Sequence, residues 1–284
     1  MSLDLDRRQR AMLQEMGVRV WWPELLASAP ASSQKGSDKP AVPQVTVDPS
    51  NAGAAALEAS NDRAPDRGLR TASLSAAQLV GVSTMDWVTL AQTIATCQAC
   101  KLCIGRRAAV FAAGAEPTRA DWLVVGEAPD DDEDRLGTPF AGQAGLLLDN
   151  MLKALGVSRG RPDGVAMAAA NTAYLSDCVK CRPAVIRNPE LQELATCESY
   201  LKREVELVQP KVILALGRFA AQTLLQGSMP EVSSIPLGKL RGQIYRYQGI
   251  PVIVSYHPAY LLRTPQDKAR SWADLCLALA AKAV

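Results

Sequence analysis

The sequence predicts an α/β fold for residues 86–284, with three α/β/α layers around a central parallel sheet. Short apolar runs, which include Trp122 to Val125, Val212 to Leu216 and Pro251 to Ser255, alternate with longer segments of helical periodicity. Runs that are apolar at successive positions are typical of strands buried on both faces, as in a parallel sheet covered by helices. The alternation therefore favours a layered α/β domain.

The predicted helices cover residues 143–155, 190–208, 217–225 and 268–283. Gly156 is a suitable C-cap for the first of them, and Gly217 opens the third. Three polar loops follow strands, with the sequences GEAPDDDED, DCVKC and SYHPAYLLR. Sites in such sheets lie beyond the carboxyl ends of the strands, so we expect the functional residues in these loops.

Two segments precede this domain. Residues 1–27 form a short amphipathic element with an aromatic pair, Trp21 and Trp22. The element is too small to bury a core alone. Two hypotheses remain open: it docks on a protein partner as a helix in a groove, or it packs on its own domain. Residues 28–85 are rich in Ala, Ser, Pro and Gly and contain no aromatic residue, which predicts a disordered linker.

Composition narrows the class of protein. The chain has 284 residues and a formal net charge of only +2, so a strongly basic nucleic-acid coat is absent. A local basic rim would still suffice to hold phosphates. No apolar run is long enough for a membrane helix, and the charged N-terminus lacks the apolar core of a secretory signal. We therefore expect a cytoplasmic protein without a membrane partner, and a monomer.

Seven cysteines in a cytoplasmic protein indicate metal or cluster ligation instead of disulfides. Their spacing allows zinc in two CxxC pairs, a CxxCxxC run joined by one distant cysteine, or a cluster on one CxxC and two later cysteines. The zinc set is Cys97, Cys100, Cys178 and Cys181. The CxxCxxC set is Cys97, Cys100 and Cys103 with one distant cysteine. The set of one CxxC and two later cysteines is Cys97, Cys100, Cys181 and Cys197. Cys276 falls on an apolar helix face and is expected in the core.

Seven motifs occur in order between residues 94 and 283: CQACKLC, VVGEAPDDDEDRLGTPFAGQAGLLLDNML, DCVKCRP, RNPELQELATCESYL, VILALGRFA, KLRGQ and SYHPAYLLR. Together they resemble the family-4 uracil-DNA glycosylases, which are iron–sulfur enzymes. The resemblance implies a structural 4Fe-4S cluster held by Cys97, Cys100, Cys181 and Cys197. Cys103 and Cys178 would then be bystanders.

The resemblance also implies roles for single residues. Phe140 would stack on a base flipped out of the DNA, and His257 would stabilise the departing base anion. Glu127 and Glu133 would polarise water or stabilise the sugar cation, with the backbone at Glu127 and Ala128 lining the pocket. Asp177 would contact the edge of the base, and Arg263 would meet a DNA phosphate.

Two positions depart from the family pattern. Asp130 stands where the family has glycine, a residue that permits positive φ or close approach of a base. Asp177 stands where the family has the asparagine that reads uracil. An ionised aspartate only accepts hydrogen bonds and would face uracil O4, another acceptor, so weak activity on uracil is expected. A protonated Asp177 would still imitate asparagine in part, whereas an ionised one suits the exocyclic amine of cytosine.

The sequence thus predicts a DNA glycosylase that hydrolyses the N-glycosidic bond of uracil or another deaminated or damaged base in base-excision repair. Its partner would be DNA that contains the modified base. The alternative is a glycosylase-like DNA-binding or interaction protein that keeps the cluster but excises bases weakly or not at all. A zinc-stabilised α/β domain of unrelated function is the third hypothesis.

Overall fold

The computed structural model describes residues 81–111, 119–159, 172–185 and 187–283. The predicted N-terminal element and most of the predicted linker lie outside these residues, as does the expected docking segment. The described residues form a six-stranded sheet in the order β2-β3-β1-β4-β6-β5. Its strands are β1 (Trp122–Gly126), β2 (Ser158–Arg159), β3 (Thr172–Asp177), β4 (Val212–Leu216), β5 (Ile244–Tyr247) and β6 (Ile250–Ser255).

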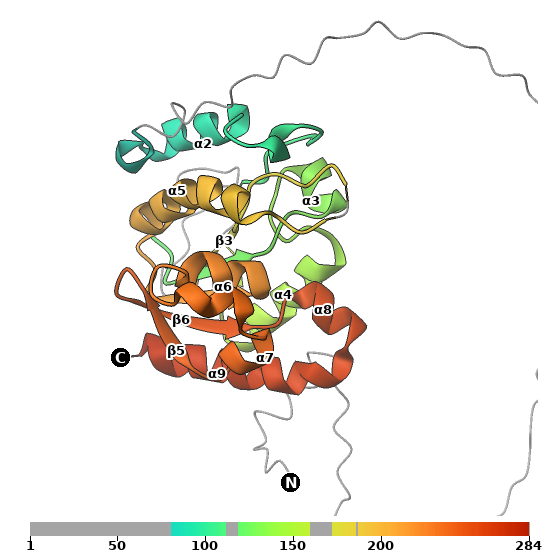
Figure 1. Cartoon of the computed structure of the whole chain (residues 1–284). Helices are drawn as coiled ribbons and strands as arrows, with labels where there is room; N and C mark the ends of the chain where they lie inside the picture. The colour runs from blue at the N-terminus through green and yellow to red at the C-terminus, as the bar shows by residue number, and fades with distance from the viewer. Residues whose placement is uncertain (1–80, 112–118, 160–171, 186, 284) are drawn as a thin grey trace, which may run out of the picture. The chain divides into compact units, whose positions relative to one another are not determined.

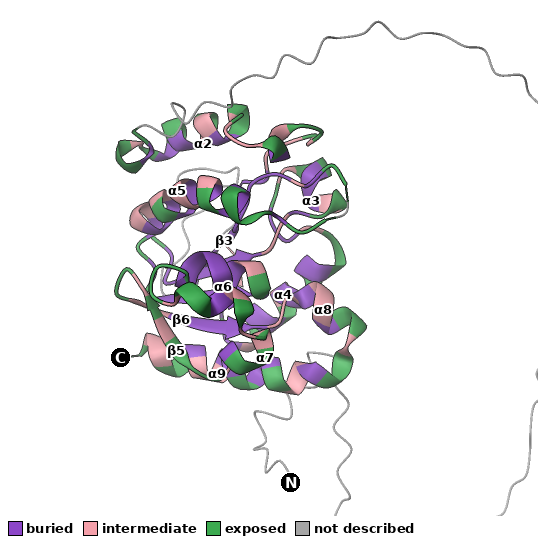
Figure 2. Cartoon of the chain, in the orientation of Figure 1, coloured by how far each residue is buried: buried purple, intermediate pink, exposed green. Residues whose placement is uncertain are grey.

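Alternate side chains of the central strands enter two separate cores. Leu123, Val125 and Ile213 belong to one hydrophobic cluster, whereas Trp122 and Val124 belong to the other. Each core is covered by helices, which makes three layers, as the sequence predicts (Figure 1). The central strands β1, β3 and β4 are buried along their whole length, whereas the outer faces of the helices are exposed (Figure 2).

The first core lies under α2 (Trp87–Thr96), α5 (Leu191–Val208) and α6 (Arg218–Leu225). The second lies under α4 (Gly142–Ala154), α8 (Pro258–Arg263) and α9 (Lys268–Lys282). The four predicted helices match α4, α5, α6 and α9 within one residue at each end. Short elements complete the set: α3 (Asp131–Leu136), α7 (Leu237–Leu240) and the 3-10 turns η2 (Val82–Thr84), η3 (Lys101–Cys103), η5 (Pro230–Ser234) and η6 (Pro265–Asp267).

The sheet is not wholly parallel. β5 pairs antiparallel with β6, and the two strands form a hairpin closed by Gln248 and Gly249. Both residues have positive φ, at 50° and 83°, which suits a two-residue turn that follows the twist of the strands. The other four strand pairs are parallel. β5 is therefore an antiparallel edge strand added to an otherwise parallel sheet.

The folded domain begins before the predicted boundary at residue 86. The turn η2 lies in the last part of the predicted linker, and Val82 is buried in the core next to α5. The Nε of Arg203 on α5 donates to the carbonyl oxygen of Met85 at 2.7 Å. A single valine among small polar residues was too weak a signal to move the boundary, but its burial fixes this segment to the domain.

Among the described residues, no helix has both the length and the apolar character that crossing a bilayer demands.

Candidate active site

The candidate site lies at the carboxyl ends of three parallel strands. β1 ends at Gly126, directly before Glu127, and β3 ends at Asp177, which is the register partner of Gly126. His257 follows the end of β6 by two residues. Because the strands are parallel, these three loops leave the same edge of the sheet, as the sequence predicts.

Gly126 brings the side chains of the site together. A methyl group at this position would lie 2.4 Å from Oδ1 of Asp177 and 2.7 Å from Cζ of Phe140. The ring of Phe140 stacks on that of His257, with 5.5 Å between centroids and an interplanar angle of 21°. Phe140 therefore lies against His257, and a side chain larger than that of Gly126 would displace both Phe140 and Asp177.

The backbone of Phe140 is held in an unusual conformation, with a φ of 53°. Its N–H donates to Oε1 of Glu133 at 2.5 Å, and its carbonyl oxygen accepts from both terminal nitrogens of Arg159 at 3.3 Å. The same carbonyl would clash with any side chain at Gly145. Left-handed backbone in a non-glycine residue costs energy and persists only where the surroundings impose it. These contacts thus fix the ring proposed to stack on a base.

Asp177 is 2% exposed, and its Oδ2 has no hydrogen-bond partner among the described residues. Burial raises the pKa of its carboxyl well above the ordinary value, and the charge of Glu133 adds to the effect. Lys180, which opposes the shift, bonds instead to the Asp177 carbonyl oxygen, to Ser176 and to Glu204. A buried carboxyl without a paired cation favours the neutral form, so the expectation of an ionised Asp177 is not supported.

His257 is half-buried, and its Nδ1 accepts from the N–H of Ala259 at 3.3 Å. Burial lowers the pKa of the imidazole to about 4, and the positive charge of Arg263 acts in the same direction. The ring is therefore neutral at physiological pH. With Nδ1 as acceptor, the proton lies on Nε2, which remains available as a donor.

Glu133 has a different position from the one expected of a catalytic group. The segment expected as an acidic loop contains the helix α3, and Asp130 and Glu133 form a capping box at its start. Oε2 of Glu133 accepts from the N–H of Asp130 at 2.7 Å, and Oε1 accepts from that of Phe140. Burial raises its pKa to about 7. Since both oxygens hold backbone amides, the geometry makes Glu133 a positioning residue.

The same capping box explains why an aspartate is suited to position 130. Its φ is −88°, an ordinary extended value, and its side chain accepts from the N–H of Glu133 at 3.0 Å. The positive φ that a glycine would permit at this position is therefore not used in this chain. Aspartate is among the preferred residues at a helix N-cap, and its charge suits the first turn.

Glu127 joins two elements at the mouth of the site. Its Oε1 accepts from the backbone N–H groups of Arg218 and Phe219, at 2.8 and 3.3 Å, and its side chain packs directly on Gly217. Burial raises the pKa of Glu127, whereas these amides oppose the shift. The backbone of Glu127 and Ala128 borders a cavity of about 280 Å³.

The basic residues at this edge have unequal freedom. Arg263 is exposed on α8, and no ion pair of its side chain is recorded among the described residues. Arg241 is largely buried and pairs with Asp274 at 2.7 Å, so it is not available to DNA. Arg187 pairs with the buried Glu193 at 2.7 Å.

The four expected cluster ligands are free thiols that pack against the first core, with Cys181 and Cys197 fully buried and Cys97 and Cys100 half-buried. Three of the sulfurs accept hydrogen bonds. Cys181 accepts from Nη1 of Arg106 at 2.8 Å, Cys197 from the N–H of Lys180 at 3.3 Å, and Cys97 from that of Ala99 at 3.5 Å. Burial raises the pKa of the Cys181 thiol to about 11, opposed by Arg106.

No three histidine, cysteine, aspartate or glutamate side chains in the described ranges converge as they would around one metal ion. Cys103 lies in η3 and is half-buried, and Cys178 is buried beside Asp177. Cys276 packs against the second core, as expected. Donors directed at three of the four predicted sulfurs suit thiolate ligands, but the four do not gather as a metal group within the described residues, so the iron–sulfur cluster stays a prediction.

Comparison with known proteins decides the family. The model of the uracil DNA glycosylase superfamily matches residues 113–278. The chain belongs to the uracil DNA glycosylase superfamily. Its relatives include type-4 uracil-DNA glycosylases from Archaeoglobus fulgidus (34% identical, covering 62% of this chain and 83% of the relative), Saccharolobus solfataricus (35%, 62% and 77%) and Thermotoga maritima (34%, 64% and 85%).

Within this superfamily domain, sequence reasoning located the main side chains but missed those that hold them. Arg159, which holds the Phe140 carbonyl, forms an ion pair with Asp149 at 2.5 Å. Lys180, Ser176 and Glu204 form a buried polar cluster directly behind Asp177. Arg159 lies after the end of the motif that closes at Leu152, so no motif pattern identifies it. Lys180 lies inside the DCVKCRP motif, but its contacts depend on burial that the sequence does not record.

Proposed function

We propose that this protein is a DNA glycosylase that removes uracil from DNA in base-excision repair, and that a neutral Asp177 reads the base. Membership of the superfamily and the type-4 relatives support the reaction. The observation that carries the choice of base is the buried Asp177 carboxyl without a cation. A neutral carboxyl has one donor and one acceptor, as an asparagine amide does. It can donate to uracil O4 and accept from N3–H.

The remaining side chains support the reaction at the sugar. Phe140 offers a face for the flipped base, and Nε2–H of the neutral His257 is the donor for uracil O2. The bond between C1′ and N1 breaks with its electrons moving to the base, and the donors stabilise the resulting anion. Water then adds to the oxocarbenium-like sugar and loses a proton. Glu127, with its raised pKa, is the group proposed to accept it.

A panel of duplex oligonucleotides tests this function under single-turnover conditions. Each contains one uracil, hypoxanthine, xanthine or cytosine, and the released base is measured with purified protein. We expect release of uracil, and a loss of about 100-fold or more in His257→Ala, because a donor to the developing anion is removed. If no base is released although the protein is folded and binds DNA, the alternative of a non-catalytic DNA-binding protein replaces the proposal.

We also propose a structural 4Fe-4S cluster on Cys97, Cys100, Cys181 and Cys197. Thiolates satisfy the iron atoms, and the cluster would link the segment before β1 to β3 and α5 without taking part in hydrolysis. Free thiol ligands of this kind suit the reducing cytoplasm in which we place the protein. Support comes from the amide and guanidinium donors at three of these sulfurs.

Anaerobic purification tests the cluster independently of activity. The protein should be brown, with a broad absorption near roughly 400 nm. Cys181→Ser should lose the colour and the iron, whereas Cys103→Ser and Cys178→Ser are matched controls that should keep both. Colourless protein with stoichiometric zinc would exclude the cluster. Loss of iron in Cys178→Ser, with retention in Cys197→Ser, would point to the other ligand set.

A further inference from the structure

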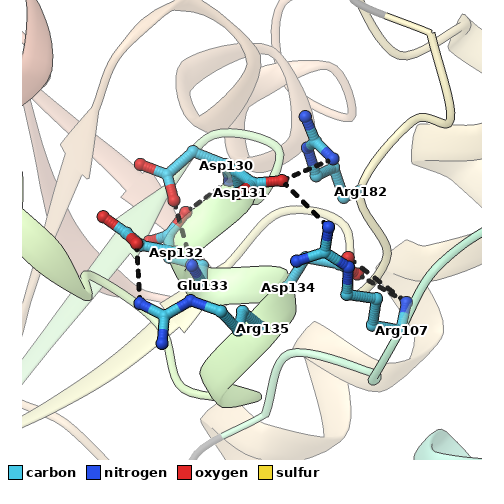
Figure 3. Close-up of polar contacts among 8 residues, drawn as sticks. All are labelled: Arg107, Asp130, Asp131, Asp132, Glu133, Asp134, Arg135 and Arg182. Atoms are coloured by element: carbon cyan, nitrogen blue, oxygen red, sulfur yellow. Dashed lines mark hydrogen bonds and ion pairs between the residues drawn. The ribbon is translucent and has the colours of Figure 1, made fainter.

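Asp131 occupies an unusual place among the charges of α3. Its Oδ1 lies 3.1 Å from Nη1 of Arg182 and 3.8 Å from Nη2 of Arg107. The two arginines come from different segments, one before β1 and the other after β3, and their guanidinium groups meet at one carboxylate (Figure 3). A carboxylate between two guanidinium groups has the charge and the acceptor oxygens of a phosphodiester in the same place.

This group borders the proposed active site. The cavity of about 280 Å³ beside Glu127 and Ala128 is also lined by Asp131 and Arg182. A nucleotide flipped toward the pocket brings its flanking phosphates to this rim. The inference rests on the proposed function in this respect, since it takes DNA as the ligand.

The ion pair is able to exchange its partner. The side chains of Asp131 and Arg107 are 60% and 58% exposed, and that of Arg182 is 31% exposed. Exposed ion pairs contribute little to stability, so breaking this one costs little free energy. Arg187, which lines the same cavity, differs because both terminal nitrogens bond to the buried Glu193 at 2.7 and 2.8 Å.

The other acidic residues of α3 are engaged elsewhere. Asp132 pairs with Arg135 of the same helix at 2.8 Å, and Asp134 is buried and accepts from the backbone N–H of Arg107 at 3.0 Å. Asp130 and Glu133 form the capping box. Asp131 is thus the acidic side chain of this helix that contacts both Arg182 and Arg107 (Figure 3).

We propose that Arg182 and Arg107 form a binding site for a DNA phosphate, and that Asp131 acts as an internal competitor for it. In free protein the carboxylate neutralises the two arginines. A DNA phosphate displaces the Asp131 carboxylate. Part of the free energy of the phosphate contact is therefore used to break the ion pair between Asp131 and the two arginines. Asp131 thereby lowers affinity for undamaged DNA, which offers only its backbone, while a flipped base adds contacts in the pocket.

Binding of a uracil-free, fluorescein-labelled duplex tests this by anisotropy across a series of salt concentrations. Asp131→Asn should raise affinity about two- to fivefold, the range expected when an exposed ion pair no longer competes. It should also steepen the slope of log K against log salt by roughly one, since one more phosphate is fully neutralised. Asp132→Asn is the matched control: it makes the same charge change on the next residue and should leave the slope unaltered.

A double-mutant comparison identifies the competitor. Arg182→Gln should cost more affinity in the Asp131→Asn background than in the wild-type protein, and Arg107→Gln should follow with a smaller effect. Equal gains from Asp131→Asn and Asp132→Asn would mean that only net charge matters, and would overturn the proposal. So would an equal cost of Arg182→Gln in both backgrounds. Far-ultraviolet circular dichroism and melting temperature establish that each variant is folded.

The experiment separates the two proposals. The probe carries no uracil, so the salt response does not depend on excision. If the panel of bases gives no release but the predicted salt response appears, the phosphate site stands and the proposed activity fails. If uracil is excised and the response is absent, only the role of Asp131 is wrong.

Discussion

At the residue scale, the pocket depends on what surrounds each functional side chain. Asp177 has a buried carboxyl with one orphan oxygen, while the nearest cation, Lys180, is bound to Glu204 at 2.9 Å. His257 is kept neutral by burial and by the charge of Arg263. Under the proposed function, the neutral forms of these two side chains would face a base that leaves as an anion. Neither state is visible in the residue type alone.

Burial of Asp177 makes stability depend on pH. Its folded-state pKa is raised, so the stability associated with its neutral form is present at low pH and is lost as pH rises through that pKa. Asparagine does not ionise. The melting temperature of Asp177→Asn should therefore exceed that of wild type by an amount that grows toward alkaline pH. A constant difference across the range would show that Asp177 is already ionised at neutral pH.

Gly126 offers a second test at this scale. A Cβ there would lie 2.4 Å from Asp177 and 2.7 Å from Phe140, so both side chains must move. Overpacking of this kind costs about 1–3 kcal/mol of folding free energy. We expect Gly126→Ala to remain folded but to lose at least about tenfold in single-turnover excision, since the pocket is displaced. The exposed Gly227, which has nothing within 4 Å of its Cβ position, gives a control variant that should keep full activity.

At the element scale, contacts at the starts of the short helices α3 and α6 hold the side chains of the candidate site in place. α3 places Glu133 so that one carboxylate fixes both its own N-terminus and the backbone of Phe140. The start of α6 is held by Glu127 from the end of β1. These hydrogen bonds connect the segment after β1 with Phe140 and with the start of α6. Hydrogen bonds at helix N-termini therefore position the site as much as the strands do.

Replacing Glu133 tests the role of α3. Glutamine has one acceptor oxygen where glutamate has two, so Glu133→Gln leaves the N–H of Asp130 or of Phe140 without its partner. A buried amide left unpaired costs about 1–3 kcal/mol, and we expect a loss of that size in the free energy of unfolding by urea. Excision should fall through a misplaced Phe140, with the pH profile unchanged in shape. A Glu133→Gln variant of full stability but abolished activity would restore the catalytic role.

The sequence predicted α4, α5, α6 and α9, the buried strands and the order of the site loops because their signals are local and repeated. α3 and β5 were missed for opposite reasons. The acidic run of α3 lacks an apolar stripe, and its helical state depends on the capping box formed by Asp130 and Glu133. β5 has no buried residue and depends on pairing with β6 through a turn at Gln248, which is not a common residue at positive φ.

At the scale of the whole molecule, the domain is larger than its motifs. The family match begins at residue 113, but η2 and α2 pack on the first core, and the expected ligands Cys97 and Cys100 lie between α2 and η3. The segment before β1 thus closes the face of the sheet that carries α5. The ionisation of Asp177, by contrast, depends on burial produced by the whole fold, which no motif records.

Truncation tests this extent of the domain. A chain that begins at residue 81 keeps Val82 in the core and the Met85 carbonyl as acceptor for Arg203. A chain that begins at residue 86 loses both, and we expect it to be less stable by about 1–3 kcal/mol, chiefly from the buried valine. Thermal unfolding of the two chains measures the difference. Equal melting temperatures would place the boundary at residue 86 after all.

The claim that a neutral Asp177 reads uracil is tested most directly by the pH dependence of single-turnover uracil excision, measured from about pH 6 to about pH 10. The wild-type protein should be active at neutral pH and should lose activity as pH rises through the raised pKa of Asp177, because an ionised carboxylate repels uracil O4. Asp177→Asn should retain its activity over that range. A wild-type protein inactive at neutral pH beside an active Asp177→Asn variant would contradict the account.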